Sequence, residues 1–355
     1  MDFKNCFTNL RKETISMNVL VTGGAGYIGS HTCKALAEAG WSAVTYDNLS
    51  TGHEWAVKWG PLVIGDLCDA PLLRRTIRRY DVKAVVHFAA SSLVGESVRH
   101  PREYFRNNLV NTLGLLDAML DCGVTSMVFS STCATYGEPQ SESLDETHPQ
   151  MPVNPYGETK LAIERALRWY GDAYGIRSVC LRYFNAAGAD QDAEIGELHE
   201  PETHLVPLVL EAALDPQRPV SIFGTNFPTP DRSAVRDYIH VSDLAAAHVR
   251  ALGLLAAGGG SVSLNLGTGR GHSVREVIAS VERVVGRKVR TIEAPRRAGD
   301  PAMLVAAAQL ARTVLKWQPR RSDLDDIVRS AWQWRTGSLM RSLQTPAMSQ
   351  AAIGD

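Results

Sequence analysis

The sequence lacks the usual marks of a metal centre, a disulfide framework or a membrane protein. Its six cysteines include no Cys-x-x-Cys pair, and its ten histidines include no His-Glu-x-x-His spacing, so we expect no metal and no set of disulfides. Reduced thiols in a cytoplasmic protein are the simplest interpretation. No run is long and apolar enough to span a membrane, so no membrane partner is expected.

An excess of charge of one sign is also missing. The net charge is −1, from 37 Lys and Arg against 38 Asp and Glu, and we therefore expect no nucleic-acid partner. Residues 1–16 are charged and lack the apolar stretch of about 7–15 residues that a secretory signal needs. We interpret them as an N-terminal extension, with Met17 as an alternative start just before the first predicted strand.

The stretch VLVTGGAGYIGS at residues 19–30 predicts a dinucleotide-binding turn. Its apolar residues 19–21, followed by Thr22, indicate a buried strand, and its glycines precede a helix that opens with Tyr27 and Ile28. Glycine is needed where such a turn is tight, where the backbone approaches a pyrophosphate and where the helix packs on the strand. The N-terminus of the helix then offers free N–H groups to the phosphates.

Asp47 follows a second apolar run at residues 43–46. A carboxylate here can accept hydrogen bonds from a ribose 2′-hydroxyl and would repel a 2′-phosphate, which favours NAD over NADP. The alternative is that Asp47 only forms a turn in the segment Asp-Asn-Leu-Ser.

Strands and helices alternate along the first half of the chain. Further strands are predicted at residues 62–64, 84–88, 127–131 and 179–184, with helices at 72–80, 101–122 and from 156 onward. This alternation is typical of an α/β fold: a Rossmann-type, doubly wound parallel sheet, here with a smaller C-terminal substrate domain.

The alternation breaks after residue 185. A helix is predicted at 205–214, residues 238–241 look like a return to the sheet, and a helix at 243–257 and a strand at 264–266 follow. We assign 17–185 to the NAD-binding domain, to which 236–266 returns, and 186–235 and 267–340 to the substrate domain. The glycine-rich stretch 267–271 lacks the Gly-Lys-Ser/Thr of a P-loop and is interpreted as a turn.

Tyr156 and Lys160 are the strongest catalytic candidates. Four residues apart on a predicted helix, they share one face. An ammonium near a phenol lowers the phenol's pKa from about 10, so Tyr156 can take a proton from an alcohol while NAD takes the hydride. A chance Tyr/Lys pair on a solvated helix is the alternative, but the preceding dinucleotide unit and the strand end Ser-Ser-Thr at 130–132 favour catalysis.

Several segments together carry a resemblance over residues 17–335. They are TGGAGYIGS at 22–30, DNLS at 47–50, VHFAA at 86–90, VGES at 94–97, RNNLVNT at 106–112, FSSTCATYG at 129–137, NPYGETK at 154–160, LRYFNAAGA at 181–189, VRDYIHVSDLA at 235–245 and RRAGDP at 296–301. On these segments the chain resembles the extended short-chain dehydrogenase/reductase family, and within it the UDP-glucose 4-epimerases.

The resemblance implies reversible 4-epimerisation of UDP-glucose and UDP-galactose through a 4-keto intermediate, with tightly bound NAD. It implies that Tyr156 is the base, Lys160 its partner and Thr132 the hydroxyl beside the sugar. The implied cofactor-binding residues are Gly23, Gly26, Tyr27, Ile28, Gly29, Asp47, Asn48, Asp66, Leu67, Phe88, Ala89, Ala90, Asn107, Ser130, Tyr156, Lys160 and Tyr183. The implied substrate-binding residues are Thr132, Tyr156, Asn185, Leu205, Arg236, Arg297, Asp300 and Leu304.

The resemblance also implies a homodimer joined by the helices at 101–122 and 156–172, which carry more apolar positions than one buried face needs. Simpler interpretations stay open for four substrate-side residues. Arg236 can pair with its neighbour Asp237, Arg297 can belong to a solvated basic turn, Asn185 can be a turn former, and Leu304 can be a core residue of a strand at 303–306.

Three positions depart from the family pattern. Thr132 replaces the usual Ser, Ser92 stands where many members have a Lys near the NAD phosphates, and His204 replaces an Asn near the substrate phosphate. Three other functions are alternatives to this one. A 4,6-dehydratase needs an acid and a base where Cys133 and Ala134 stand, a regulatory NAD-binding protein would not need Tyr156 and Lys160, and an epimerase of UDP-N-acetylhexosamine or a UDP-pentose remains open.

Overall fold

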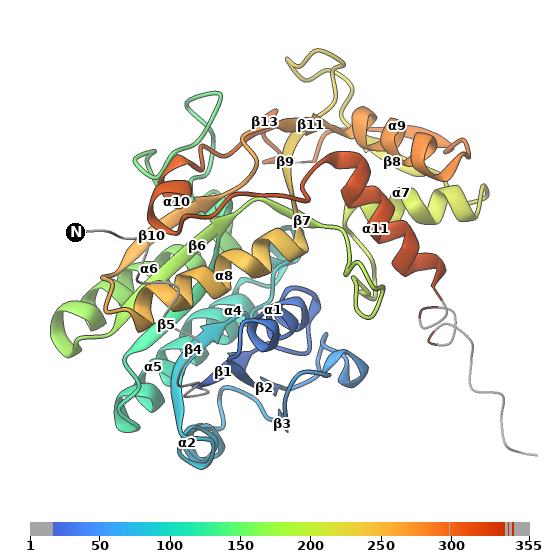
Figure 1. Cartoon of the computed structure of the whole chain (residues 1–355). Helices are drawn as coiled ribbons and strands as arrows, with labels where there is room; N and C mark the ends of the chain where they lie inside the picture. Colours follow the sequence, from blue (N-terminus) through green and yellow to red (C-terminus); the bar gives the residue numbers. More distant parts are fainter. Residues whose placement is uncertain (1–16, 298, 338–339, 341–342, 344–355) are drawn as a thin grey trace, which may run out of the picture.

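The computed structural model describes residues 17–297, 299–337, 340 and 343. The expectation for residues 1–16 lies outside this range. Figure 1 shows one large sheet covered by helices, with the helices of a smaller domain beyond one end of its strands. Within the described ranges, no helix combines the length and apolar character that crossing a membrane requires.

The large sheet has seven strands in the order β10-β6-β5-β4-β1-β2-β3, and its strand pairs are parallel. The strands are β1 (Asn18–Thr22), β2 (Ser42–Asp47), β3 (Leu62–Ile64), β4 (Val82–His87), β5 (Ser126–Thr132), β6 (Arg177–Tyr183) and β10 (Val262–Leu266). The chain moves from β1 to β3 in one direction and from β4 onward in the other. The order therefore reverses between β1 and β4, where such sheets bind ligands at the carboxyl ends of their strands. The predicted fold class is confirmed.

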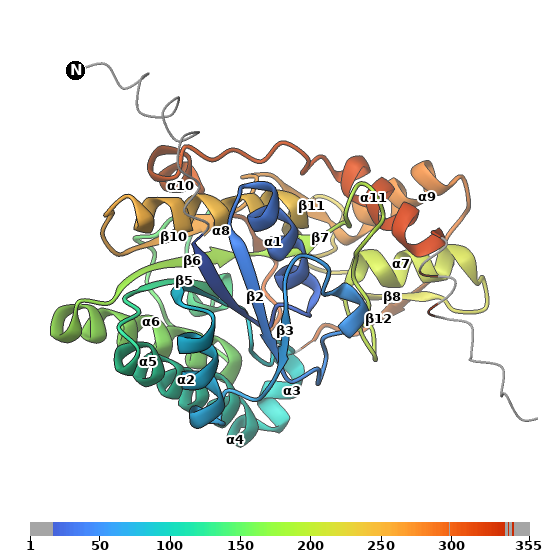
Figure 2. The same cartoon turned by 60° about the horizontal axis from the view of Figure 1, so that its bottom comes forward.

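Helices cover both faces of this sheet (Figure 2). One face carries α1 (Tyr27–Glu38), α8 (Val241–Ala256) and, near β10, α10 (Gln309–Val314). The other carries α2 (Ala70–Arg79), α5 (Asn111–Asp121) and α6 (Pro155–Tyr174).

The alternation of side chains along the strands produces two separate cores. In β1, Val21 packs with Leu36 of α1 on one face, whereas Leu20 packs with Leu73 of α2 and Leu116 of α5 on the other. Because successive strand side chains point to opposite faces, an unbroken apolar strand needs a helical layer on each side.

The predicted helix at 101–122 is present but is not uniform. It consists of α4 (Pro101–Tyr104), a π-helical segment (Phe105–Val110) and α5, and it follows the short helix α3 (Val94–Arg99). Single π-helical turns within α-helices occur frequently at functional sites. This one carries Asn107 and Asn108.

The smaller domain has its own core. Helices α7 (Leu205–Leu214), α9 (Val274–Val285) and α11 (Leu324–Thr336) pack around it, beside the two-stranded sheet of β8 (Val220–Phe223) and β12 (Thr291–Ala294). The start of α9 has the capping box formed by Ser273 and Glu276.

A four-stranded sheet joins the two domains, and it corrects one sequence-based prediction. It contains β7 (Asn185–Ala187), β9 (Val235–His240), β11 (Gly271–Ser273) and β13 (Met303–Leu304). The prediction that residues 238–241 return to the large sheet is therefore wrong, because β9 belongs to this separate sheet.

The buried carboxylate of Asp237 helps to hold β9 in this separate sheet. It accepts hydrogen bonds from the backbone N–H groups of Thr268 (2.9 Å), Gly269 (3.0 Å) and Ala306 (3.2 Å). These bonds attach β9 to the C-terminal part of the chain, and they hold the glycine-rich stretch 267–271 as a turn.

Candidate active site

The glycine turn after β1 leaves no room for side chains. Gly23 has φ +73°, and a Cβ there would lie 2.6 Å from the backbone nitrogen of Ala89. A Cβ on Gly29 would lie 2.1 Å from the Gly23 carbonyl oxygen. Gly26 is the N-cap residue, so the first turn of α1 has no side-chain cap. The turn thus presents bare backbone at the helix N-terminus, as a pyrophosphate group requires.

Asp47 ends β2 beside this turn. It is buried, and its two carboxylate oxygens accept hydrogen bonds from the backbone N–H groups of Ala25 (3.0 Å) and Leu49 (2.8 Å). Burial raises the pKa of Asp47, and these two bonds offset part of the rise. A carboxylate has about four lone-pair sites, so sites remain for ribose hydroxyls.

Three more predicted cofactor residues meet beside Asp47. The Asn48 side-chain amide donates to the carboxylate of Asp66 at 2.8 Å, and the buried side chain of Leu67 follows directly. The Cys68 backbone N–H holds the pKa of Asp66 below its usual value. The ends of β2 and β3 therefore form one polar surface.

Further predicted cofactor residues lie along the ends of β1 and β4. Phe88, Ala89 and Ala90 follow β4 and are partly exposed, and the N–H groups of Phe88 and Ala89 both donate to the Thr22 carbonyl (2.8 and 3.1 Å). On the other side of the glycine turn, the hydroxyl of Tyr27 donates to the Gly188 carbonyl at 2.6 Å, while Ile28 packs against the core. The residues present fit a bound dinucleotide.

Asn107 and its neighbour Asn108 hold the loop after β4. The Asn107 amide donates to the Ser91 hydroxyl at 3.1 Å. Asn108 is fully buried; it accepts from the Ser91 N–H (2.8 Å), donates to the Ser91 carbonyl (2.9 Å) and donates to the Thr159 hydroxyl in α6 (3.2 Å). Sequence reasoning missed Asn108, for which the Asn-Asn pair was the available signal.

The start of α6 brings Tyr156 next to Thr132. The Asn154 side chain caps the helix by accepting from the Gly157 N–H at 2.9 Å, which places Tyr156 in its first turn. A Cβ on Gly157 would lie 2.4 Å from the Ala134 carbonyl oxygen, so the helix packs directly on the turn that follows β5. The Thr132 hydroxyl accepts from the Ala134 N–H at 3.1 Å. Burial raises the pKa of Tyr156, and the nearby Thr132 hydroxyl offsets part of that rise.

Lys160 lies one helical turn further along, beneath the tyrosine ring. Its ammonium donates to the Ser130 carbonyl at 2.8 Å and lies 5.9 Å from the centre of the Tyr156 ring. The Ser130 hydroxyl in turn bonds with the Tyr183 hydroxyl at 2.6 Å. Tyr156, Lys160, Thr132, Ser130 and Tyr183 thus meet at the ends of β5 and β6.

The expected lowering of the Tyr156 pKa by Lys160 is wrong for the protein without ligands. Burial raises the pKa of the Tyr156 phenol, and the nearby Tyr183 raises it further. Burial also lowers the pKa of Lys160 to about 7, so Lys160 gives less positive charge than an exposed lysine would. Burial therefore opposes the lowering of the Tyr156 pKa that the Tyr156–Lys160 spacing predicted.

A buried polar network that the sequence reasoning missed supports this arrangement. The Arg182 guanidinium of β6 binds the Glu164 carboxylate of α6 (2.5 and 2.9 Å), with only 5% of each side chain exposed. The same carboxylate accepts from the Ser131 hydroxyl at 2.5 Å, and Arg182 also donates to the Tyr136 hydroxyl at 2.9 Å. An arginine within the apolar run VCLRYF was the available signal.

The four-stranded sheet carries three of the predicted substrate residues, Asn185, Arg236 and Leu304. Asn185 pairs with Tyr238, and Leu304 lies opposite Arg236 in the register of β13 and β9. Arg236 forms an ion pair with Asp300, not with its neighbour Asp237. This pairing joins two residues that are far apart in the sequence.

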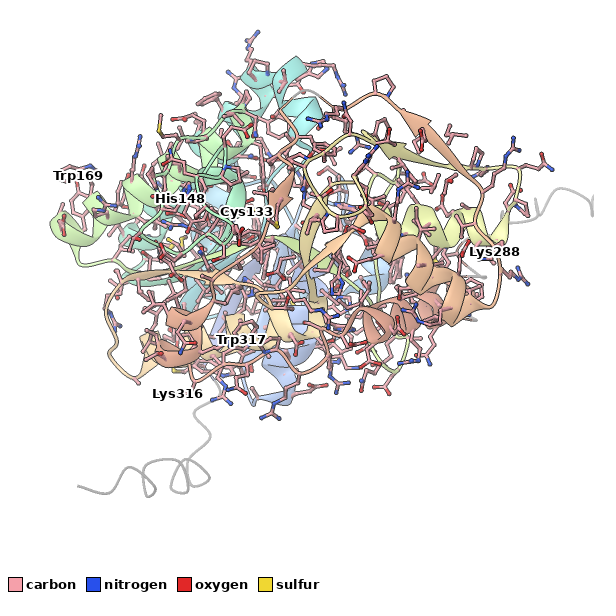
Figure 3. All side chains as sticks on the ribbon, turned by 90° about the horizontal axis from the view of Figure 1, so that it is seen from above. Cys133, His148, Trp169, Lys288, Lys316 and Trp317 are labelled. Carbon is pink, nitrogen blue, oxygen red and sulfur yellow. The ribbon has the colours of Figure 1, made fainter. Side chains whose placement is uncertain are left out.

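This sheet meets the catalytic turn at Cys133, the residue after Thr132. Partly buried Leu304 packs against the cluster that contains Cys133 and Phe184, and Figure 3 shows Cys133 near the middle of the molecule. Burial raises the pKa of Cys133 to about 12, against a smaller lowering by Arg236. Arg236 and Leu304 are therefore near the catalytic turn.

The other two predicted substrate residues lie further out. Leu205 begins α7, with His204 as the N-cap residue. The guanidinium of exposed Arg297 stacks 3.9 Å from the ring centre of Phe223, while its carbonyl accepts from the Asp300 N–H at 3.3 Å. Arg297 thus adjoins the Arg236–Asp300 pair through its backbone.

Comparison with known proteins gives consistent matches over most of the chain. The profile of the NAD dependent epimerase/dehydratase family matches residues 19–267. A UDP-glucose 4-epimerase of Rhizobium meliloti (strain 1021) is 53% identical over 319 residues, which cover 90% of this chain and 97% of that protein.

Two solved structures are also similar. The UDP-glucose 4-epimerase from Brucella ovis in complex with NAD is 51% identical, with a TM-score of 0.87, over 89% of this chain and 97% of that one. The enzyme from Stenotrophomonas maltophila, with bound NAD and formylated UDP-arabinopyranose, is 40% identical, with a TM-score of 0.88, over 92% and 99%.

Proposed function

The chain belongs to the NAD dependent epimerase/dehydratase family, and on this premise we propose that it interconverts UDP-glucose and UDP-galactose by epimerisation at C4. Bound NAD would supply the redox chemistry, because it can take up a hydride from C4 and give the same hydride back. The observation that carries the proposal is the meeting of Tyr156, Lys160 and Thr132 at the same sheet edge as the glycine turn.

The roles of the chain's own residues follow from their positions. Tyr156 removes the O4 proton and later restores it, and the Thr132 hydroxyl orients the sugar beside the phenol. Lys160 fixes the end of β5 through the Ser130 carbonyl and adjoins the cofactor. Arg236, Arg297 and Asp300 hold the diphosphate and uridine, and Asn185 and Leu205 also contact the sugar nucleotide.

The residues that bind NAD in this proposal are those at the ends of β1 to β6. Gly23, Gly26 and Gly29, with Tyr27 and Ile28, surround the pyrophosphate. Asp47, Asn48, Asp66 and Leu67 surround the adenosine, and the remaining contacts come from Phe88, Ala89, Ala90, Asn107, Ser130 and Tyr183.

Elimination, as in a 4,6-dehydratase, is disfavoured by the turn after β5. The Cys133 thiol has its pKa raised to about 12 by burial, and Ala134 has no titratable group. Neither can transfer the additional proton that elimination needs near neutral pH.

The proposal is tested by incubating the NAD-loaded protein separately with UDP-galactose, UDP-N-acetylgalactosamine and UDP-arabinose and separating the products. UDP-glucose should be the main product of the fastest reaction. If UDP-arabinose is the only substrate turned over, the protein is a UDP-pentose 4-epimerase instead. The ligand in the Stenotrophomonas maltophila structure, formylated UDP-arabinopyranose, raises this possibility.

Leu304 is proposed to face the 2-position of the sugar, where it controls substrate size. Wild type should turn over UDP-N-acetylgalactosamine measurably, and Leu304→Tyr should lose this activity while it keeps UDP-galactose turnover. A Tyr that protrudes into the acetamido group would cost about 1–3 kcal/mol of overpacking. Leu304→Met, which conserves volume, is the control. Equal losses on both substrates in the Tyr variant would show that Leu304 is only a core residue.

Ser92 is proposed to weaken NAD retention. Charged hydrogen bonds are roughly twice as strong as neutral ones, so Ser92→Lys should release NAD about tenfold more slowly than wild type. The measurement is activity without added NAD after repeated gel filtration, with Ser143→Lys, on an exposed loop, as the control. Full wild-type activity after exhaustive dialysis would contradict the prediction.

We propose that the protein forms a homodimer through its helical stretches 101–122 and 156–172. Large apolar side chains are exposed on this side of the molecule: Val98 (60%) on α3, Val110 (57%) on the π-helical segment and Trp169 (71%) on α6, the last at the outer end of α6 in Figure 3. Such exposure is typical of an interaction surface. Light scattering at micromolar concentration should give twice the 38.7 kDa chain mass, and Val110→Glu should shift the protein toward the monomer. A wild-type monomer would refute the dimer.

We also propose that the protein is located in the cytoplasm. All five cysteines in the described ranges are free thiols, and three of them are buried, as expected in a reducing compartment.

A further inference from the structure

Four side chains from one short run meet before α7. They are Glu197, His199, Glu202 and His204, and one possible metal-ligating atom of each lies within 4.8 Å of the other three. Within this Glu-x-His-x-x-Glu-x-His run, only His204 stands at a position that the family resemblance places near the substrate phosphate.

The distances between these atoms are close to those of a four-coordinate metal site. The Glu197 Oε1 atom lies 2.7 Å from Nδ1 of His204 and 3.2 Å from Nδ1 of His199. The Glu202 oxygens lie 3.1 Å from His204 Nδ1 and 3.9 Å from His199 Nδ1. Zinc bonds to nitrogen and oxygen of about 2.0–2.1 Å place tetrahedral ligands about 3.3 Å apart.

Two of the four atoms are buried without a hydrogen bond. Within the described part of the chain, Glu197 Oε1 and His199 Nδ1 have no hydrogen-bond partner, and only 6% of the Glu197 side chain is exposed. Both atoms lie within ion-pair distance of other members of the cluster, Glu197 Oε1 of the two imidazoles and His199 Nδ1 of the two carboxylates, but none of these contacts is a hydrogen bond. A buried oxygen or nitrogen in this state is costly, and a cation at the centre of the cluster would satisfy both atoms.

Neighbouring groups fix the orientation of the cluster. The Glu202 carboxylate accepts from the backbone N–H groups of Thr203 (2.7 Å) and His204 (2.8 Å). The Trp334 indole donates to the Glu197 carbonyl at 3.0 Å, and the Tyr27 ring lies edge-on to the His199 ring at 6.4 Å. Such outer contacts typically accompany metal ligands.

A nearby cluster of three carboxylates differs because a lysine ammonium already lies among them. Asp190, Asp192 and Glu194 also lie close together, but the Lys34 ammonium binds all three at 2.8–3.2 Å. That group already contains its cation.

We propose that Glu197, His199, Glu202 and His204 bind one divalent transition-metal ion of the Zn²⁺ type. Two imidazoles with two carboxylates favour such an ion over Mg²⁺ or Ca²⁺, which prefer oxygen ligands alone. Four protein ligands make the site structural rather than catalytic, and partly exposed His204 and His199 give the ion access. The ion joins the chain segment beside α1 to the start of α7.

This proposal departs from the expectation of no metal, which considered only the Cys-x-x-Cys and His-Glu-x-x-His spacings. It is independent of the epimerase proposal, because metal binding is measured without turnover.

The test is a Zn²⁺ titration of the full, NAD-loaded chain without a polyhistidine tag, after treatment with EDTA and in competition with a zinc indicator. Wild type should bind about one equivalent with a dissociation constant below about 1 µM. His199→Ala and Glu202→Gln should each weaken binding at least a hundredfold, whereas His100→Ala, at an exposed histidine outside the cluster, should not. Absence of stoichiometric binding, or equal binding by wild type and His199→Ala, would overturn the proposal.

A second measurement uses only the wild-type chain, in case the variants fold poorly. Crystals grown with Zn²⁺ should show an anomalous peak among the four side chains when diffraction is measured on both sides of the zinc absorption edge. A zinc-containing crystal with no peak there would also overturn the proposal.

Discussion

Tyr156→Phe should bind NAD as wild type does and should lose at least a hundredfold of its epimerisation rate, about 2.7 kcal/mol in the barrier. The ring of Phe retains the packing of Tyr156 at the start of α6, but it has no proton to exchange with O4. General acid–base catalysis contributes about 10²–10⁴-fold to a rate, which sets the size of the expected loss. The measurements are the rate with saturating UDP-galactose and the NAD content after gel filtration.

Tyr170→Phe is the matched control, because it removes the same hydroxyl from the same helix. Tyr170 lies in α6 and donates to Asp117 at 3.0 Å, away from the Thr132 turn, so its rate should be unchanged. A Tyr156→Phe rate within tenfold of wild type would show that another group transfers the O4 proton.

Arg182→Met should lower the free energy of unfolding by about 3–5 kcal/mol, the usual cost of removing one partner of a buried ion pair. The substitution leaves the Glu164 carboxylate buried with two remaining donors, the Ser131 hydroxyl at 2.5 Å and the more distant Gln150 amide at 3.5 Å. It also removes a donor from the Tyr136 hydroxyl. Urea unfolding of the NAD-loaded protein, followed by circular dichroism, measures the change.

Arg283→Met tests whether burial is the cause. Arg283 pairs with Asp325 on the surface, with 59% and 31% of the two side chains exposed. Exposed pairs typically contribute less than about 1 kcal/mol, so this variant should unfold nearly as wild type does. Similar losses in the two variants would mean that burial does not set the contribution of the Arg182–Glu164 pair.

The Arg182–Glu164 pair also marks a limit of reasoning from sequence. Arg182 stands in a predicted strand and Glu164 in a predicted helix, and both elements were located correctly. Nothing local, however, indicates that the two charges face one another. That contact depends on how α6 crosses β5 and β6, which is a property of the packed layers.

The pKa of Tyr156 is a second property that the sequence alone did not predict. The spacing of Tyr156 and Lys160 indicated one helical face, which the structure has, but the inferred lowering of the phenol's pKa had the wrong sign. Spacing gives proximity, whereas the pKa also depends on burial, which disfavours the charged forms of both residues.

The sequence by itself determined the parallel α/β fold, the glycine turn before α1 and the placement of Tyr156 and Lys160 on one helix. These features depend on side-chain period, on glycine's lack of a Cβ and on capping by nearby residues, all of which act over a few positions. Only the tertiary structure decided that β9 leaves the large sheet, that Arg236 pairs with Asp300 and that Asn108 holds the Ser91 loop. Those contacts join residues far apart in the chain, and the buried groups concerned take whichever partner the packed layers bring within hydrogen-bonding distance.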